Sequence, residues 1–147
     1  MRPRREHCGA EAARVLRRGG QYILVSFNRL DLNPVPKAAG EAVGTLFPED
    51  PRYMERGPFS YTDPARIEND LRAAGFEVIE LETIELASRV SARDAAYGIV
   101  LGSPFRGEIE RLDPSALERA TAAVEQSLRD WDGRDAPISA HIATATR

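Results

Sequence analysis

The chain has 147 residues, of which 42% are hydrophobic and 29% are charged, and its formal net charge at neutral pH is -3. This length suffices for one domain around a single core and is too short for two. The weak negative charge gives no electrostatic reason to expect nucleic acid or an anionic membrane as a partner. No apolar run approaches the roughly 18 to 20 residues of a membrane-spanning helix. Cys8 is the only cysteine, so no intramolecular disulfide can form, and a reducing cytoplasm is the expected location.

The first elements are predicted to be a short helix that leads directly into a strand. Residues 1–10 show neither a capping residue nor a periodic pattern, so we expect a loose tail there and one domain over residues 11–147. Apolar residues share one helical face over residues 11–18, and two glycines, 19 and 20, end this helix. Gln21–Phe27 is apolar without alternation, which is typical of a strand buried on both faces.

Two pairs of a capping residue and a proline predict the next helices. Asn33-Pro34 starts one helix, with Asn33 as its cap, and Asp63-Pro64 starts another. A second strand is predicted over residues 76–86, where glutamates alternate with apolar residues and suit a sheet edge protected by charge. After Thr83 the apolar positions change phase, which indicates a bulge or an end to regular pairing.

The last third predicts more helices and a final strand. Ser91, with Asp94 three residues later, resembles a capping box that opens a helix, and Pro104 separates this helix from a second piece. Asp113-Pro114 starts a further helix with a clear apolar stripe. Residues 138–146 alternate small apolar and polar side chains, which predicts the last strand.

The order of these elements resembles the second half of the class I S-adenosylmethionine-dependent methyltransferases. The late helix and fifth strand of that family resemble residues 11–27 (EAARVLRRGGQYILVSF), although arginine stands at position 18 where proline is commonest. The helix before the sixth strand resembles residues 58–76 (PFSYTDPARIENDLRAAGF). An insertion before the seventh strand, found in a subgroup with small-molecule substrates, resembles residues 91–111 (SARDAAYGIVLGSPFRGEIER).

The resemblance implies the fold. In the family the seventh strand runs antiparallel between the fifth and the sixth. We therefore expect an α/β protein with the C-terminal half of a Rossmann-like fold: a three-stranded mixed sheet with flanking helices. In this sheet residues 138–146 are central and antiparallel, between Gln21–Phe27 and residues 76–86.

The resemblance also implies a cofactor, which the family holds on its first half. A glycine-rich loop after the first strand approaches the methionine part of S-adenosylmethionine, and an acidic residue at the end of the second strand binds the ribose. Neither feature has a counterpart among these 147 residues. We therefore expect no cofactor-binding residue here and no binding of S-adenosylmethionine by this chain alone.

Two hypotheses about function follow. In the first, the chain is a truncated or split part of a methyltransferase with a small-molecule acceptor, inactive alone, and its partner is a chain that supplies the missing half. In the second, it is a non-catalytic binding or oligomerisation module that uses the open edge of its sheet. In both, the strand Gln21–Phe27 exposes unpaired backbone groups beside apolar side chains, so we expect the chain alone to self-associate.

The acceptor-side candidates follow from their positions in the resemblance, after the fifth strand, before the Asp-Pro helix and in the inserted helical segment. They are Phe27, Asn28, Asn33, Phe59, Tyr61, Tyr97 and Ser103. For each of them a packing or capping role is the alternative, and Tyr97 with the turn at Ser103 is also a candidate lid.

The two histidines, His7 and His141, are the remaining residues with a possible chemical role. His141 is a candidate general base, but a lone strand histidine without a paired carboxylate is more often a packing residue. His7 beside Cys8 provides too few ligands for a metal site, so no metal is expected.

Overall fold

The computed structural model describes residues 5–49 and 53–147. The chain divides into two compact units, each assembled from stretches that are separated in the sequence. Unit 1 consists of Met1–Asn28, Tyr61–Ile84 and Ser139–Arg147, and unit 2 of Arg29–Ser60 and Glu85–Ile138. Neither unit therefore corresponds to a continuous half of the sequence.

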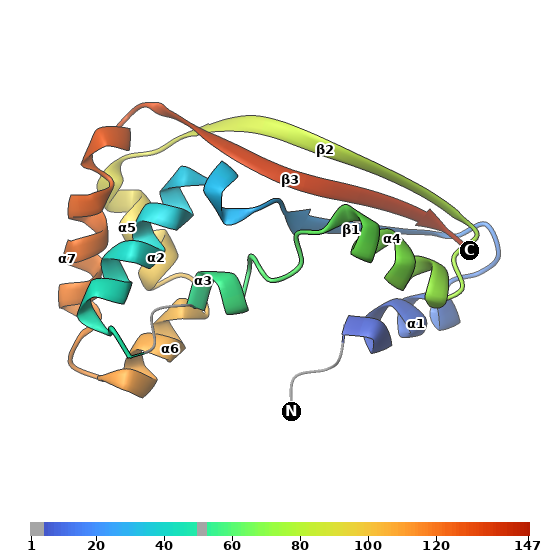
Figure 1. The fold of residues 1–147 in the computed structure, drawn as a ribbon, viewed down its shortest axis with the longest axis horizontal. Helices are drawn as coiled ribbons and strands as arrows, with labels where there is room; N and C mark the ends of the chain where they lie inside the picture. Colours follow the sequence, from blue (N-terminus) through green and yellow to red (C-terminus); the bar gives the residue numbers. More distant parts are fainter. Residues whose placement is uncertain (1–4, 50–52) are drawn as a thin grey trace. The chain divides into compact units, whose positions relative to one another are not determined.

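In the described part of the chain, three strands form one open antiparallel sheet in the order β1-β3-β2 (Figure 1). They are β1 (Gln21–Phe27), β2 (Val78–Arg89) and β3 (Asp135–Thr146). β1 and β3 pair antiparallel from Gln21↔Thr146 to Phe27↔Ala140. The expected order and the central, antiparallel last strand are confirmed.

The expectation of a mixed sheet is wrong. Towards the start of β2 the Glu77 amide donates to the Thr146 carbonyl at 3.0 Å, and further along Thr83 contacts His141, so β2 and β3 also run antiparallel. β1 and β2 point the same way but are separated by β3, so no parallel ladder exists between the described strands. The bounds of β1 are as predicted, whereas β2 continues beyond residue 86 and β3 begins before residue 138.

In unit 1, α1 (Arg5–Val15) and α4 (Pro64–Ala73) lie on the same face of the sheet (Figure 1). The buried side chains of this core are Ala13, Ile67, Leu71, Phe76, Ala143 and Ala145. Small residues on β3 let both helices approach the middle of the sheet, and the Tyr22 and Phe76 rings stack with centroids 5.7 Å apart. α1 begins six residues before the helix start expected at position 11, so the predicted loose tail is wrong for residues 5–10. Residues 1–4 of that predicted tail lie outside the described residues.

The other face of β1 is exposed. Ile23 is 63% and Val25 65% accessible, and Phe27 is also exposed, whereas Tyr22 and Leu24 are half-buried against α1 and α4. The prediction that this strand is buried on both faces is therefore wrong, because the helices of unit 1 pack on one face only. A continuous apolar run is compatible with a strand that buries only alternate residues.

The last residue of the chain closes the turn between α1 and β1. The Gly19 amide donates to the Arg147 carbonyl at 2.6 Å, and the Arg147 amide donates to the Gly20 carbonyl at 3.0 Å. Gly19 has a φ of 75°, which glycine adopts without a steric penalty. α1 itself ends at Val15, so Gly19 and Gly20 form the turn before β1 and not the predicted end of the helix. This turn is where β3 is anchored to β1.

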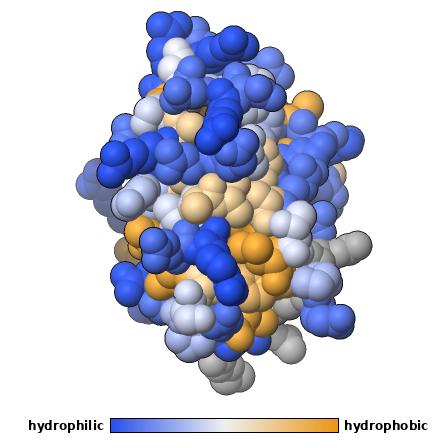
Figure 2. All heavy atoms as spheres, turned by 90° about the vertical axis from the view of Figure 1, so that its left-hand side faces the viewer, coloured by the Kyte–Doolittle hydropathy of each residue, from blue (hydrophilic) through white to orange (hydrophobic). Residues whose placement is uncertain are grey.

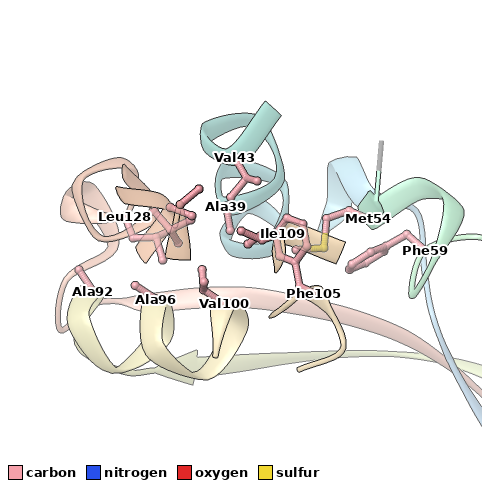
Figure 3. Close-up of a cluster of buried hydrophobic side chains, with 13 residues drawn as sticks. Ala39, Val43, Met54, Phe59, Ala92, Ala96, Val100, Phe105, Ile109 and Leu128 are labelled. Carbon is pink, nitrogen blue, oxygen red and sulfur yellow. The ribbon is translucent and has the colours of Figure 1, made fainter. Parts of the chain in front are cut away.

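Unit 2 is helical around its own core. Its helices are α2 (Pro34–Leu46), α3 (Tyr53–Arg56), α5 (Ala92–Val100), α6 (Phe105–Leu112) and α7 (Leu117–Ser127), with 3-10 turns η1 (Leu30–Leu32) and η2 (Arg129–Trp131). Side chains of α2, α5 and α6, among them Val43, Val100 and Ile109, point towards one centre (Figure 3). Fully buried alanines such as Ala96 and Ala120 allow these helices to pack closely.

The surface of unit 2 is partly apolar. Leu32, Leu86, Val90 and Tyr97 are exposed. One face of the molecule, seen in Figure 2, carries an apolar area among hydrophilic side chains. Large exposed apolar side chains thus occur in both units.

Two of the four predicted helix caps are confirmed by their hydrogen bonds. The Asp63 carboxylate accepts from the Ala65 amide at 2.9 Å, and the Ser91 hydroxyl accepts from the Asp94 amide at 3.0 Å. The predicted cap Asn33 is different, because its side chain makes no capping hydrogen bond with α2. Its Nδ2 instead donates backwards to the Arg29 carbonyl at 3.0 Å. Asp113 accepts from the Ser115 amide, and α7 begins only at Leu117.

Arg89 and Asp135 form a two-pronged ion pair in unit 2. Arg89 Nε and one terminal nitrogen each donate to a carboxylate oxygen of Asp135 at 2.8 Å. These hydrogen bonds, with the guanidinium charge, hold the pKa of Asp135 below its usual value. The pair therefore stabilises the fold above the ordinary carboxyl pKa of about 3.9, and this contribution is lost as the pH falls through the lower folded-state pKa.

We predict that Arg89→Gln returns the pKa of Asp135 towards its ordinary value, because the neutral amide cannot hold the carboxylate charge in the same way. The side-chain carboxyl chemical shift of Asp135, followed by NMR between pH 2 and 6, checks this. Arg129→Gln is the control and should leave the titration of Asp135 unchanged. An equally low pKa in Arg89→Gln contradicts the prediction.

Candidate functional site

The imidazole of His141 is one of the buried polar groups of unit 1. His141 lies on β3, opposite Ser26 of β1, and is 3% accessible. Its Nδ1 lies 2.9 Å from the Thr83 hydroxyl on β2, and its Nε2 lies 3.1 Å from the Thr62 carbonyl. The ring therefore joins β3, β2 and the segment before α4.

These contacts define the roles of both ring nitrogens. A carbonyl oxygen can only accept, so Nε2 carries the hydrogen that is donated to Thr62. In the neutral ring Nδ1 then accepts from the Thr83 hydroxyl. A general base needs a lone pair directed at a substrate proton, and here that lone pair is used by Thr83. The geometry favours the packing role of His141 over the general-base role.

Asn28 binds β3 at Ser139, two residues before His141. Its amide N–H donates to the Ser139 carbonyl and its Nδ2 donates to the Ser139 hydroxyl, both at 3.0 Å. Ser139 is buried, so the end of β1 is fixed to β3 by two polar contacts. The candidate Asn28 thus lies at the carboxyl end of β1, where its side chain aligns the two strands.

The contacts of His141, Thr83, Asn28 and Ser139 form the polar cluster of unit 1. Tyr61 contacts Ser26 beside this cluster, at the start of the segment that leads into α4. Its hydroxyl donates to Asp70 Oδ2 at 2.8 Å, and its carbonyl accepts from the Ser26 hydroxyl. The guanidinium of Arg66 lies 5.6 Å from the ring centroid and 3.8 Å from Asp70. The Tyr61 phenol is thus held by the Asp70 carboxylate, which also forms an ion pair with Arg66.

A cavity of ≈ 240 Å³ opens next to Tyr61 within unit 1. It is lined by Cys8, Gly9, Tyr22, Leu24, Tyr61, Asp70 and Leu71. Its walls are mostly apolar, and the Tyr61–Asp70 pair supplies polar atoms. This combination of apolar walls with a few directed polar groups is typical of small-molecule sites.

The seven candidates do not all lie in this unit. Phe27, Asn28 and Tyr61 belong to unit 1, and Asn33, Phe59, Tyr97 and Ser103 belong to unit 2. Within unit 1, Asn28 contacts Ser139 and Tyr61 lines the cavity, while Phe27 is exposed at the end of β1.

Three of the four candidates in unit 2 are buried or hydrogen-bonded within the unit, which indicates a structural role. Asn33 is 1% accessible, and Phe59 belongs to the buried core. The Ser103 hydroxyl donates to the Ile99 carbonyl at 2.6 Å and accepts from the Phe105 amide at 3.1 Å, which links α5 to α6. Tyr97 is the exception, since it is 47% accessible on α5, with the Arg93 guanidinium 5.7 Å from its ring centroid.

Asp70 and Thr83, which contact Tyr61 and His141, were not among the candidate site residues of the sequence analysis. Asp70 lies between the buried residues of an amphipathic helix, where an acid that is not on the exposed face indicates a partner. Thr83 marks the phase change in β2: the less exposed positions are Ile79 and Leu81 before it and Ile84 after it. That phase change was visible in the sequence.

The described residues do not fit S-adenosylmethionine. In the described part, the glycines with positive φ are Gly19, Gly75 and Gly133, and each precedes a strand. A loop that cradles a nucleotide needs glycine after a strand and before a helix. β1 is followed by Asn28 and Arg29 and β2 by Val90 and Ser91, so neither strand-to-helix turn contains glycine.

A metal site and a membrane-spanning helix are both absent from the part of the chain that the structure describes. Within residues 5–49 and 53–147, no three histidine, cysteine or acidic side chains gather closely enough to hold a metal ion. None of the helices described there combines the length and apolar character needed to cross a membrane.

The sequence was compared with protein-family models and with curated proteins, and none of them matches it.

We predict that the His141 contacts stabilise unit 1. His141→Ala should lower the free energy of unfolding by about 2 to 4 kcal/mol, because it removes the hydrogen bond to the Thr62 carbonyl and creates a cavity. Thr83→Val should cost only about 1 kcal/mol, since Thr83 is exposed and water can replace its hydroxyl. Urea denaturation followed by circular dichroism gives both values.

Thr144→Ala, on the opposite face of β3, is the matched control and should stay within about 0.5 kcal/mol of the parent. A loss in His141→Ala no greater than that of the control would show that the imidazole is not held as described.

Proposed function

We propose that this chain is the acceptor-side part of a class I S-adenosylmethionine-dependent methyltransferase with a small-molecule acceptor. In this proposal the cofactor is bound by polypeptide outside residues 1–147, on the same chain or on a partner. The observation that carries the proposal is the strand order β1-β3-β2, with the last strand antiparallel in the middle. This is the order that the resemblance implies for the fifth, seventh and sixth strands.

The strand order is informative because consecutive strands, β1 and β2, are not neighbours in the sheet. Strands that follow one another in sequence are neighbours in the sheet about two-thirds of the time. Here β1 and β2 follow one another, point the same way and leave room for one strand between them. β3 fills that place more than 100 residues after β1. An unrelated α/β protein would reach this order only as one of several alternatives.

The chemistry of the site is compatible with methyl transfer. This reaction depends mainly on the position of the acceptor, so a dedicated acid–base pair is not required. The cavity beside Tyr61 and Asp70 provides apolar walls, a phenol and a carboxylate that can orient a small molecule. Because the described residues do not fit the cofactor, we assign them only the binding and orientation of the acceptor.

The uncharged edge of β1 supports the proposal that further polypeptide covers this strand. β1 (QYILVSF) contains no charged residue, whereas β2 carries Glu80, Glu82, Glu85 and Arg89. Charged side chains protect an exposed edge from pairing with other strands, and an uncharged apolar edge is normally covered. This contrast also favours the second candidate function, an oligomerisation module that pairs through β1.

A titration with S-adenosylmethionine tests the assignment of the cofactor. Isothermal titration calorimetry should give no saturable heat with this chain alone, because no glycine-containing turn follows a described strand. Saturable micromolar binding by this chain alone contradicts the proposal. The positive arm is the polypeptide encoded directly upstream: a strand with a glycine-rich loop there, and S-adenosylmethionine binding when it is joined to or mixed with this chain, support it.

A pair of substitutions tests the role of the β1 edge. We predict that the chain alone self-associates and that Val25→Lys reduces this association, because a lysine on β1 opposes strand pairing. Val78→Lys is the matched control, since Val78 is exposed to a similar degree on β2 and should not change it. Sedimentation velocity over a range of concentrations measures both effects. Equal reductions by both variants, or a monomer at every concentration, contradict pairing through β1.

A further inference from the structure

A second cavity lies entirely within unit 2 and shares no lining residue with the cavity beside Tyr61. It has a volume of ≈ 80 Å³ and is bounded by the first turns of α2 and α5, by η2 and by the ends of β2 and β3 that belong to this unit. Its apolar walls include Val35, Ala95, Leu128, Trp131 and Ile138. None of the seven acceptor-side candidates lines it.

The size and lining of this cavity favour an apolar occupant over water. A single water needs only about 10 to 15 Å³ and two to four polar partners. The cavity is several times larger, and its polar side chains other than arginine are Ser88 and Ser91. The Ser91 hydroxyl already accepts from the Asp94 amide at the start of α5. Water in this space would lack partners, whereas a compact hydrocarbon group would not need them.

Arg134 supplies the only charge among the lining residues. Its guanidinium is exposed and forms no ion pair with the residues that the structure describes, in contrast to Arg89, which binds Asp135. The nearby carboxylate of Asp132 accepts from the Ala92 amide at 2.8 Å. A guanidinium presents parallel N–H groups that match a carboxylate.

We propose that unit 2 binds a small monocarboxylate, with its compact hydrocarbon body in the cavity against Trp131 and its carboxylate on Arg134. This site goes beyond the proposed methyltransferase role, because it uses neither the cofactor nor the polar cluster of unit 1. The experiments below therefore test this site independently of the methyltransferase role.

Trp131 is the only tryptophan of the chain, so its fluorescence reports on this cavity directly. The probes are butanoate and hexanoate, each compared with the alcohol of the same length at constant ionic strength. We expect saturable changes with the carboxylates and weaker binding of the alcohols. Arg134→Gln should weaken carboxylate binding about tenfold and leave alcohol binding unchanged. Arg129→Gln, in η2 but outside the cavity, is the control and should change neither.

Filling the cavity provides a second measurement. Ala95→Leu should abolish the binding of both carboxylates and alcohols while the far-ultraviolet circular dichroism spectrum is retained, and Ala136→Val serves if the first variant does not fold. No saturable change with any probe, or undiminished binding in the filled variant, overturns the proposal and leaves a packing void. Equal binding of carboxylates by the parent and Arg134→Gln overturns the role of the charge.

Discussion

The pairing of β3 with both other strands is the interaction on which the rest of unit 1 depends. β1 and β2 each find their described sheet partner in β3, and the small residues Ala143 and Ala145 on β3 let the side chains of α1 and α4 reach the sheet. The buried polar groups Ser139 and His141 lie on the same strand, one bound to Asn28 after β1 and the other to Thr83 of β2. Backbone pairing, packing and the polar cluster thus converge on one segment.

The sequence predicted well those features that depend on local chemistry. An aspartate or serine before a helix acts within a few residues, so the caps at Asp63 and Ser91 were predicted correctly. The predicted glycine stop was wrong, because α1 already ends at Val15. Asn33 was mispredicted because its side chain is buried and binds the preceding turn. The face of a strand that is covered depends on distant helices, and the apolar run of β1 could not reveal that one face is open.

The candidate site was predictable only in part. The resemblance made Tyr61, before the Asp-Pro helix, an acceptor-side candidate, and Tyr61 lines a cavity of unit 1. The alternation of Ser139 with His141 indicated a shared face, but the partners Thr62 and Thr83 lie 79 and 58 residues away in the sequence. Contacts of that range depend on the strand order, which no local pattern encodes. Packing roles of Phe59 and Ser103 were left open for the same reason.

The place of β3 in the chain has a consequence for synthesis in the cell. More than 100 residues separate β1 from the strand that pairs with it. A ribosome that adds about 5 to 20 residues per second needs roughly 5 to 20 s to make them. During that interval the nascent chain presents an uncharged apolar segment with no sheet to join. Its demand on chaperones is therefore set by the distance between two strands along the messenger RNA.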